Sequence, residues 1–221
     1  MLQSALSALQ QIFTPPFRTV LYKVLGLTVA MLALVWFALD SLVVKYIAVP
    51  WPWLAATLQI MTGIGLFAGM AFLVAPVSSL IAGLFLDELA ECAEKDSDPH
   101  GPPGTALPAG QAIVLASRFA VVSLLVNILA LLLLLVPGVN LVAFFTANAY
   151  LLGREYFELA AMRYRPIAEA KALRERHGLY IFLCGMPLAA FLAVPILNLL
   201  TPLFATAFMV RIHKRMMRRG L

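Results

Sequence analysis

Four long stretches without a charged side chain are the strongest constraint in this 221-residue sequence. They lie between Lys23 and Asp40, between Lys45 and Asp87, between Arg118 and Arg154, and between Arg176 and Arg211. A helix that crosses the roughly 30 Å of bilayer hydrocarbon needs about 20 apolar residues. We therefore expect all four stretches to lie in a membrane.

Composition excludes several other classes of protein. Only 12% of the residues are charged and 62% are hydrophobic, whereas an ordinary soluble domain is about 25% charged. This excludes a soluble enzyme, a disordered chain and a disulfide-stapled secreted domain. Because no polar segment is long enough to fold alone, the sequence predicts an all-α integral membrane protein with a single membrane domain over residues 1–221.

The first two charge-free stretches predict two long transmembrane helices, over residues 20–49 and 53–86. Pro50 and Pro52 separate them, since prolines favour turns between helices. Tryptophans in this turn suit the membrane interface. In the second helix, Gly65 and Gly69 form a small-xxx-small pair, which would let another helix approach closely and is a candidate oligomer contact.

Acidic residues follow the second long helix and are expected to continue it into the cytoplasm as a solvated face. They are Asp87, Glu88, Glu91 and Glu94. We expect them to pair with Arg154, Arg163 or Arg165.

The third and fourth stretches predict two helical hairpins that penetrate only part of the bilayer, over residues 112–153 and 178–211. Each contains Val-Pro-x-x-Asn near its middle, which places the tips at Pro137 and Pro195. The return arms, from the asparagine to the next arginine, span 14 and 13 positions. At 1.5 Å per residue such an arm covers only about 20 Å. Four short, tilted spanning helices are the alternative.

The two hairpin tips resemble each other. Val136–Leu141 and Val194–Leu199 share Val-Pro-x-x-Asn-Leu at a period of 58 residues, and internal repeats are common in transport proteins. The amides of Asn140 and Asn198 could line a polar path between the tips. Alternatively, they only satisfy backbone groups that the turns leave unpaired.

The basic residues predict the orientation. Fifteen of the 16 Lys and Arg fall in the N-terminus, the 87–118 loop, the 154–176 segment and the tail, and only Lys45 lies between the two long helices. Both hairpin arrangements put these four segments on one face, so the positive-inside rule predicts cytoplasmic N- and C-termini. Residues 1–17 lack the basic start of a signal peptide, and their periodic apolar residues predict a helix lying in the membrane interface.

Candidate catalytic and metal-binding residues are sparse. Cys92 and Cys184 fit no zinc or redox spacing, so we expect reduced thiols. The three histidines show no paired metal spacing, and there is no Gly-rich phosphate loop or nucleophile elbow. We therefore expect no enzymatic activity, no cofactor, no metal and no nucleic-acid partner.

The segment Thr14-Pro-Pro-Phe-Arg-Thr19 is the most specific anion-binding feature. A proline turn opens the first long helix there, and backbone N–H groups at a helix N-terminus bind oxyanions. The guanidinium of Arg18 adds a bidentate donor at the same place. Arg18 and Thr19 are thus positioned for a tetrahedral anion, although arginine at such a position more commonly acts as a snorkelling anchor.

Four short motifs follow in order along the chain: Pro16-Phe-Arg-Thr19, Ala75-Pro76, Pro137-Gly138, and Pro195-Ile-Leu-Asn-Leu199 followed by Pro202. With them the chain resembles the CysZ family of bacterial inner-membrane sulfate permeases. The resemblance implies two long membrane helices, two partly penetrating hairpins and interfacial helices. It also implies sulfate uptake for cysteine synthesis and assembly into dimers or larger homo-oligomers.

The sulfate-binding turn departs from the family pattern, which is similar to Pro-Gly-Ile-Arg-Arg. Phe17 and Thr19 replace the glycine and the second arginine, so the resemblance carries over Arg18 and, as a hydroxyl and backbone donor, Thr19. The leading hypothesis is a channel-like or ion-coupled sulfate permease, with sulfite as a second candidate anion and membrane lipids as partners. The alternative, which the missing second arginine favours, is a non-transporting membrane scaffold or partner-binding protein on the same fold.

Overall fold

The computed structural model describes residues 2–46, 51–108, 110–111, 114 and 139–220, and these ranges contain helices and no strand. The chain divides into two compact units. Unit 1 comprises Met1–Arg18 and Phe85–Leu221, and unit 2 comprises Thr19–Leu84. The expected all-helical fold class is thus found in the described residues. That both units form a single membrane domain stays a prediction.

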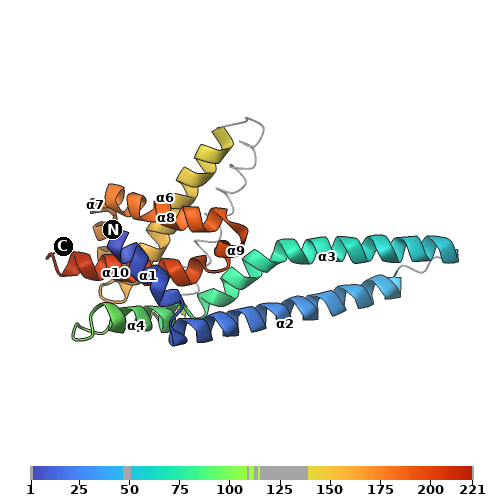
Figure 1. Cartoon of the computed structure of the whole chain (residues 1–221), viewed down its shortest axis with the longest axis horizontal. Coiled ribbons are helices and arrows are strands. Elements are labelled where there is room, and N and C mark those ends of the chain that lie inside the picture. Colours follow the sequence, from blue (N-terminus) through green and yellow to red (C-terminus); the bar gives the residue numbers. More distant parts are fainter. Residues whose placement is uncertain (1, 47–50, 109, 112–113, 115–138, 221) are drawn as a thin grey trace. The chain divides into compact units, whose positions relative to one another are not determined.

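Two long helices make up unit 2 and contain the two candidate membrane spans. Helix α2 runs over Pro15–Tyr46 and α3 over Pro52–Gly83, and Figure 1 shows them running in opposite directions. By length and composition, Pro15–Leu42 and Pro52–Met70 are able to cross a bilayer. The pattern of missing charges therefore located both long apolar helices, although α2 begins five residues before the expected position 20.

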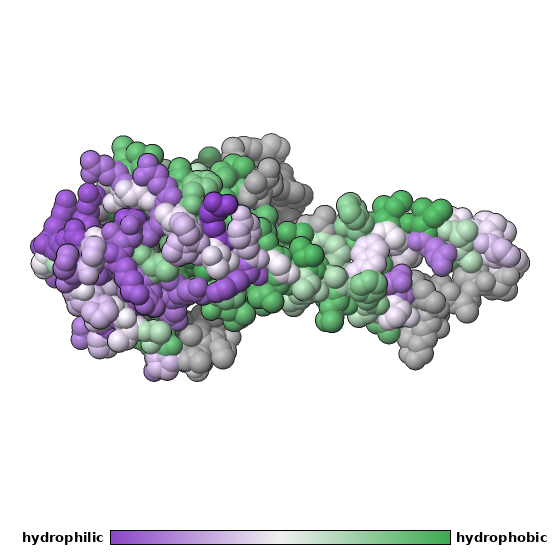
Figure 2. Space-filling view, turned by 60° about the horizontal axis from the view of Figure 1, so that its bottom comes forward, coloured by the Kyte–Doolittle hydropathy of each residue, from purple (hydrophilic) through white to green (hydrophobic). Residues whose placement is uncertain are grey.

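The exposed side chains of these two helices are mainly apolar, as on a surface that faces lipid. Phe37 of α2 is 71% exposed and Phe67 of α3 is 72% exposed. Figure 2 shows hydrophobic residues over most of the described length of the two long helices, whereas hydrophilic residues concentrate on unit 1. Large exposed apolar surfaces are rare on soluble proteins. Unit 2 is therefore built for a bilayer.

The expectation that the second long helix continues through the acidic residues is wrong. Helix α3 ends at Gly83, the Leu84 N–H turns back to the Ile81 carbonyl (3.0 Å), and a separate helix α4 covers Leu86–Ser97. Phe85 lies between the helices with φ −109° and ψ 6°, outside helical geometry. The break falls directly after Gly83.

Unit 1 gathers the remaining helices, from both ends of the chain. Besides α4 they are α1 (Leu2–Ile12), α6 (Val139–Met162), α7 (Ile167–Arg176), α8 (Gly178–Ala193), α9 (Pro195–Asn198) and α10 (Thr201–Met217). Helix α10 lies at the centre, since α1, α4, α6 and α8 all contact it (Figure 1). Every residue from Thr201 to Val210 is buried.

Helices α6 and α8 cross at very close range. A Cβ added at Gly185 would overlap the Ala149 carbonyl oxygen, and one at Gly153 would lie 2.8 Å from the Ile181 carbonyl oxygen. Small residues on both helices let their backbones meet, as in many membrane helix pairs. The glycine pair expected to make such a contact, Gly65 and Gly69, has no atom within 4 Å of an added Cβ.

In the segment predicted as the second hairpin, a helix ends just before Pro195, the predicted tip. Helix α8 ends at Ala193, and Val194 is extended (φ −99°, ψ 117°), because proline at the next position disfavours helical backbone. Helix α8 has 16 residues, or about 24 Å at 1.5 Å per residue. At its start it bends from α7 by 91°. How deeply this hairpin enters a bilayer stays a prediction.

The first hairpin lies only partly within the described residues. Its tip at Pro137 and nearly all of its outgoing arm fall outside them, as do residues 136–138 of the repeated tip motif. Its return helix α6 continues past Arg154 to Met162, with Arg154 Nε 3.4 Å from Glu158 Oε1 on the next turn. The first arginine after the stretch therefore does not mark the end of the helix.

Candidate anion-binding site

The turn that carries the predicted anion site joins α1 to α2 and is held by its own hydrogen bonds. The Thr14 N–H and hydroxyl both donate to the Gln11 carbonyl, at 3.0 and 2.7 Å. The Arg18 N–H donates to the Thr14 carbonyl at 3.0 Å. Thr14 thus closes α1 and opens α2, which begins at Pro15.

The three residues of the predicted sulfate-binding turn, Phe17, Arg18 and Thr19, differ in exposure. Phe17 is fully buried, whereas Arg18 and Thr19 are exposed. Pro15 and Pro16 occupy the first two helical positions and have no N–H, so Phe17 supplies the only backbone donor among the first three. An anion at this helix end would therefore depend on side chains, mainly on the Arg18 guanidinium, more than on the backbone.

The residues predicted at the hairpin tips lie on different helices. Asn140 is in the first turn of α6, and Pro195 opens the short helix α9. Asn198 ends α9, is half-buried, and donates its backbone N–H to the Val194 carbonyl at 2.8 Å. Pro137 lies outside the described residues. The role of these residues in a permeation path stays a prediction.

A buried ion pair joins α4 to the end of α6. Arg163 Nε donates to Glu94 Oε1 at 2.6 Å and Arg163 Nη2 to Glu94 Oε2 at 3.3 Å, with both side chains at most 5% exposed. Arg163 Nη1 also donates to Asp87 Oδ1 at 2.6 Å. The Gly104 N–H donates to Glu94 at 3.2 Å. The expected pairing of the acidic helix with Arg163 is confirmed.

A second polar contact ties both ends of the chain to α4. Gln11 is buried in unit 1, where its side-chain amide donates to the Cys92 carbonyl at 3.3 Å. Arg211 Nη2 donates to Gln11 Oε1 at 2.7 Å and also pairs with Asp96. In the tail, Arg218 Nη2 lies 3.2 Å from Asp98 Oδ1. The sequence did not predict this contact, because Gln11 is only one of several polar residues on the expected interfacial helix.

His213 of α10 is fully buried beside charged groups. Its ring stacks on Tyr164 with centroids 5.2 Å apart and meets the Phe157 ring edge-on at 5.9 Å. Neither ring nitrogen has a hydrogen-bond partner in the described part of the chain. Burial, followed by the positive charge of Arg165, lowers the pKa of His213 from 6.5 to about 4. His213 is therefore neutral at pH 7.

The cysteines and acidic residues of unit 1 show no metal-site geometry. Among the described residues, no group of three or more His, Cys, Asp or Glu is arranged to hold a metal ion. Cys184 is buried, and Cys92 is a half-buried free thiol whose pKa is raised by burial. The arginines of unit 1 instead form ion pairs, such as those of Arg163 with Glu94 and of Arg174 with Glu158.

These observations define a helical integral membrane protein with two apolar spans and a unit rich in buried polar contacts. The family described as "Sulfate transporter CysZ/Etoposide-induced protein 2.4" matches residues 4–202, and the chain belongs to this family. The expected family is thereby confirmed, and its description names a transporter and no enzyme. A search of curated proteins found no match.

Proposed function

We propose that this protein carries sulfate across the bacterial inner membrane as a channel-like or ion-coupled permease, and so supplies sulfur for cysteine synthesis. The observation that carries the proposal is the family match over residues 4–202, which includes the Arg18 turn and both long helices. Sulfite is a smaller anionic sulfur oxyanion, so it is a second candidate substrate.

In this proposal, Arg18 collects the anion at the cytoplasmic end of α2. The buried Phe17 anchors the turn, and Thr19 adds an exposed hydroxyl one residue further on. A guanidinium presents two parallel donors to a tetrahedral oxyanion, which suits sulfate. Asn140 and Asn198, at the hairpin tips, would narrow the path.

The proposed orientation places both termini in the cytoplasm. Contacts in unit 1 join all four segments that carry the basic residues. Gln11 of the N-terminus binds Arg211 of the tail, and Arg163 of the 154–176 segment binds Glu94 of the 87–118 loop. Segments that contact one another in this way lie on one side of a membrane. The excess of Lys and Arg in them supports the cytoplasmic side.

We further propose that the protein acts as a homo-oligomer in which α3 contacts a second copy. Gly65 and Gly69 lie on one face of α3, and nothing lies within 4 Å of a Cβ added at either position. Open space above a small-xxx-small pair suits the close approach of another membrane helix. Lipid covers the remaining apolar surface of α2 and α3.

A scaffold that does not transport is the second candidate function. The observation in its favour is the helix start at Pro15 and Pro16, which leaves Arg18 with little backbone help in binding an anion. Sulfate-dependent thermal stabilisation of the purified protein separates the two functions, because a ligand that binds only the folded state raises the unfolding midpoint. A permease gains stability from sulfate and loses this gain in Arg18→Ala. A scaffold gains none.

A further inference from the structure

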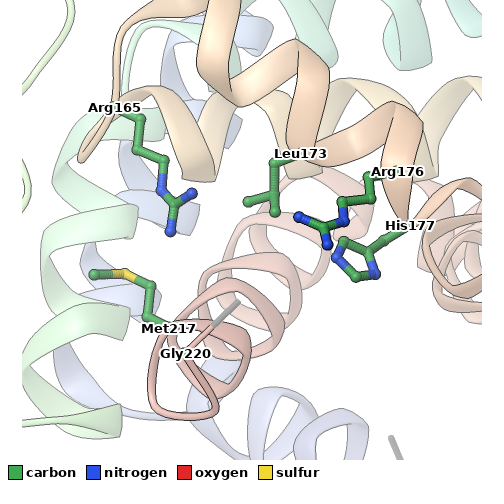
Figure 3. Close-up of a pocket in the computed structure, with 6 residues that line it drawn as sticks. All are labelled: Arg165, Leu173, Arg176, His177, Met217 and Gly220. Atoms are coloured by element: carbon green, nitrogen blue, oxygen red, sulfur yellow. The ribbon is translucent and has the colours of Figure 1, made fainter.

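A second cationic feature of unit 1 is a pocket of about 500 Å³ at the turn before α7, the end of α7 and the end of α10. Its lining residues are Arg165, Leu173, Arg176, His177, Met217 and Gly220. Figure 3 shows the guanidinium groups of Arg165 and Arg176 directed into the same space from either side of Leu173, with the His177 ring beside Arg176. Sequence reasoning missed this convergence, because the turn and the helix end meet only in the fold.

The charge of the pocket is one-sided. None of its six lining residues is acidic. The nearest acidic neighbour in sequence, Glu175, pairs with Arg174 at 2.9 Å, and Arg174 also pairs with Glu158 at 2.6 Å. No ion pair engages Arg176 among the residues that the structure describes, and His177 Nε2 is a buried atom without a hydrogen-bond partner there. Arg176 and His177 therefore offer the pocket a positive charge and a ring nitrogen that no described residue engages.

The pocket also lies at the boundary between the charged helix α7 and the apolar helix α8. His177 is the residue at which α7 and α8 bend by 91°. Helix α7 is rich in charge, whereas Leu179, two residues beyond the bend, is an apolar side chain 75% exposed on α8. Arginines at the border of a membrane-embedded segment commonly meet anionic head groups.

We infer that this pocket binds a phosphate group, carried either by an anionic phospholipid or by a free phosphate compound. Two guanidinium groups and an imidazole supply charge-assisted donors for its oxygens. A volume of about 500 Å³ falls within the roughly 300–1,000 Å³ of small-molecule sites, so there is room for an organic substituent on the phosphate. The site shares no residue with the Arg18 turn and goes beyond the proposed sulfate transport.

The test uses the purified full chain in two settings. In detergent, inorganic phosphate is titrated and its dissociation constant is obtained from the shift of the unfolding midpoint. In nanodiscs, the midpoint is compared between phosphatidylcholine alone and a mixture with phosphatidylglycerol. Arg176→Gln removes one exposed pocket cation, and Lys171→Gln removes an exposed cation of the same helix that does not line the pocket.

Each outcome decides the inference. A soluble ligand predicts that Arg176→Gln weakens phosphate binding about tenfold, the worth of one charge-assisted contact, while Lys171→Gln binds as the wild type does. A lipid ligand predicts stabilisation only by the anionic nanodisc, lost in Arg176→Gln and kept in Lys171→Gln. No response to either ligand, or equal responses in both variants, overturns the inference.

If Arg176→Gln lowers the midpoint without ligand, His177→Gln replaces it in the same comparison. Arg18→Ala should leave these responses unchanged, so failure of the transport proposal is seen separately.

Discussion

Glu94 and Arg163 lie 69 positions apart in the sequence, and their side chains form a two-point ion pair with both groups almost entirely buried. This pair fastens α4 to the end of α6, and the Thr105 N–H completes the connection by donating to the Arg163 carbonyl at 2.8 Å. The pair thus joins the cytoplasmic loop to the helix that returns from the first hairpin.

Breaking this pair should destabilise unit 1 strongly. Glu94→Gln leaves the buried Arg163 with the exposed Asp87 as its remaining carboxylate partner, and breaking a buried pair costs about 3 kcal/mol. Thermal unfolding in detergent measures the change. Lys95→Gln is the control, because its pair with Glu91 is exposed and surface pairs contribute little. Equal midpoints for the two variants would contradict the role of the buried pair.

The crossing of α6 and α8 should not tolerate a single methyl group. Gly185→Ala places its Cβ against the Ala149 carbonyl, so the helices must separate, and overpacking of this kind costs roughly 1–3 kcal/mol. Gly26→Ala in α2 is the matched control, since no atom lies within 4 Å of the added Cβ. The unfolding midpoint is the readout. A wild-type midpoint in Gly185→Ala would show that the helices do not meet there.

Stability should fall as the pH drops from about 6.5 to about 4, partly through His213. Its folded pKa is lowered to about 4, so in this interval the unfolded chain binds the proton and the folded chain does not. The neutral ring therefore stabilises the fold fully above pH 6.5, and up to about 3 kcal/mol is lost by pH 4. Denaturant unfolding across this range should show a flatter profile for His213→Phe, which keeps an aromatic ring against Tyr164. Parallel profiles would refute the assignment.

Helix α1 should depend on Gln11 for its attachment to unit 1. Gln11→Ala removes the hydrogen bonds to the Cys92 carbonyl and from Arg211, so the amides of α1 should exchange hydrogen faster. Gln10→Ala, which changes an exposed neighbour, should leave exchange unchanged. Hydrogen–deuterium exchange read by mass spectrometry compares the two, and the same exchange in both variants would count against the contact.

Much of the fold follows from the sequence because charge and proline leave clear signals. Gaps between charged residues located both spans of unit 2, and Pro195 marked the turn after α8. The burial of α10 could not be foreseen, since an apolar run such as Thr201–Val210 looks the same whether lipid or protein surrounds it. The crossing at Gly185 was missed for a similar reason, because a glycine shows no partner until the fold supplies one.

The candidate site was only partly predictable. Arg18 and its turn stand out locally, and Arg163 was among the cations expected to pair with the acidic helix. Pro15 and Pro16 have no backbone N–H, and the sequence alone shows this. The general rule that helix N-termini bind anions does not take such prolines into account. The pocket of Arg165 and Arg176 depends on a turn and a helix end meeting in space, which no spacing in the sequence records.

Flux of labelled sulfate into proteoliposomes tests the central claim most directly. The account predicts uptake above that of empty vesicles by the wild-type protein, and uptake about tenfold slower for Arg18→Ala, as expected when one charge-assisted contact to the anion is lost. Lys23→Ala, which removes an exposed cation five residues further along α2, should transport as the wild type does. Uptake no greater than that of empty vesicles, or equal uptake by Arg18→Ala and the wild type, would contradict the account.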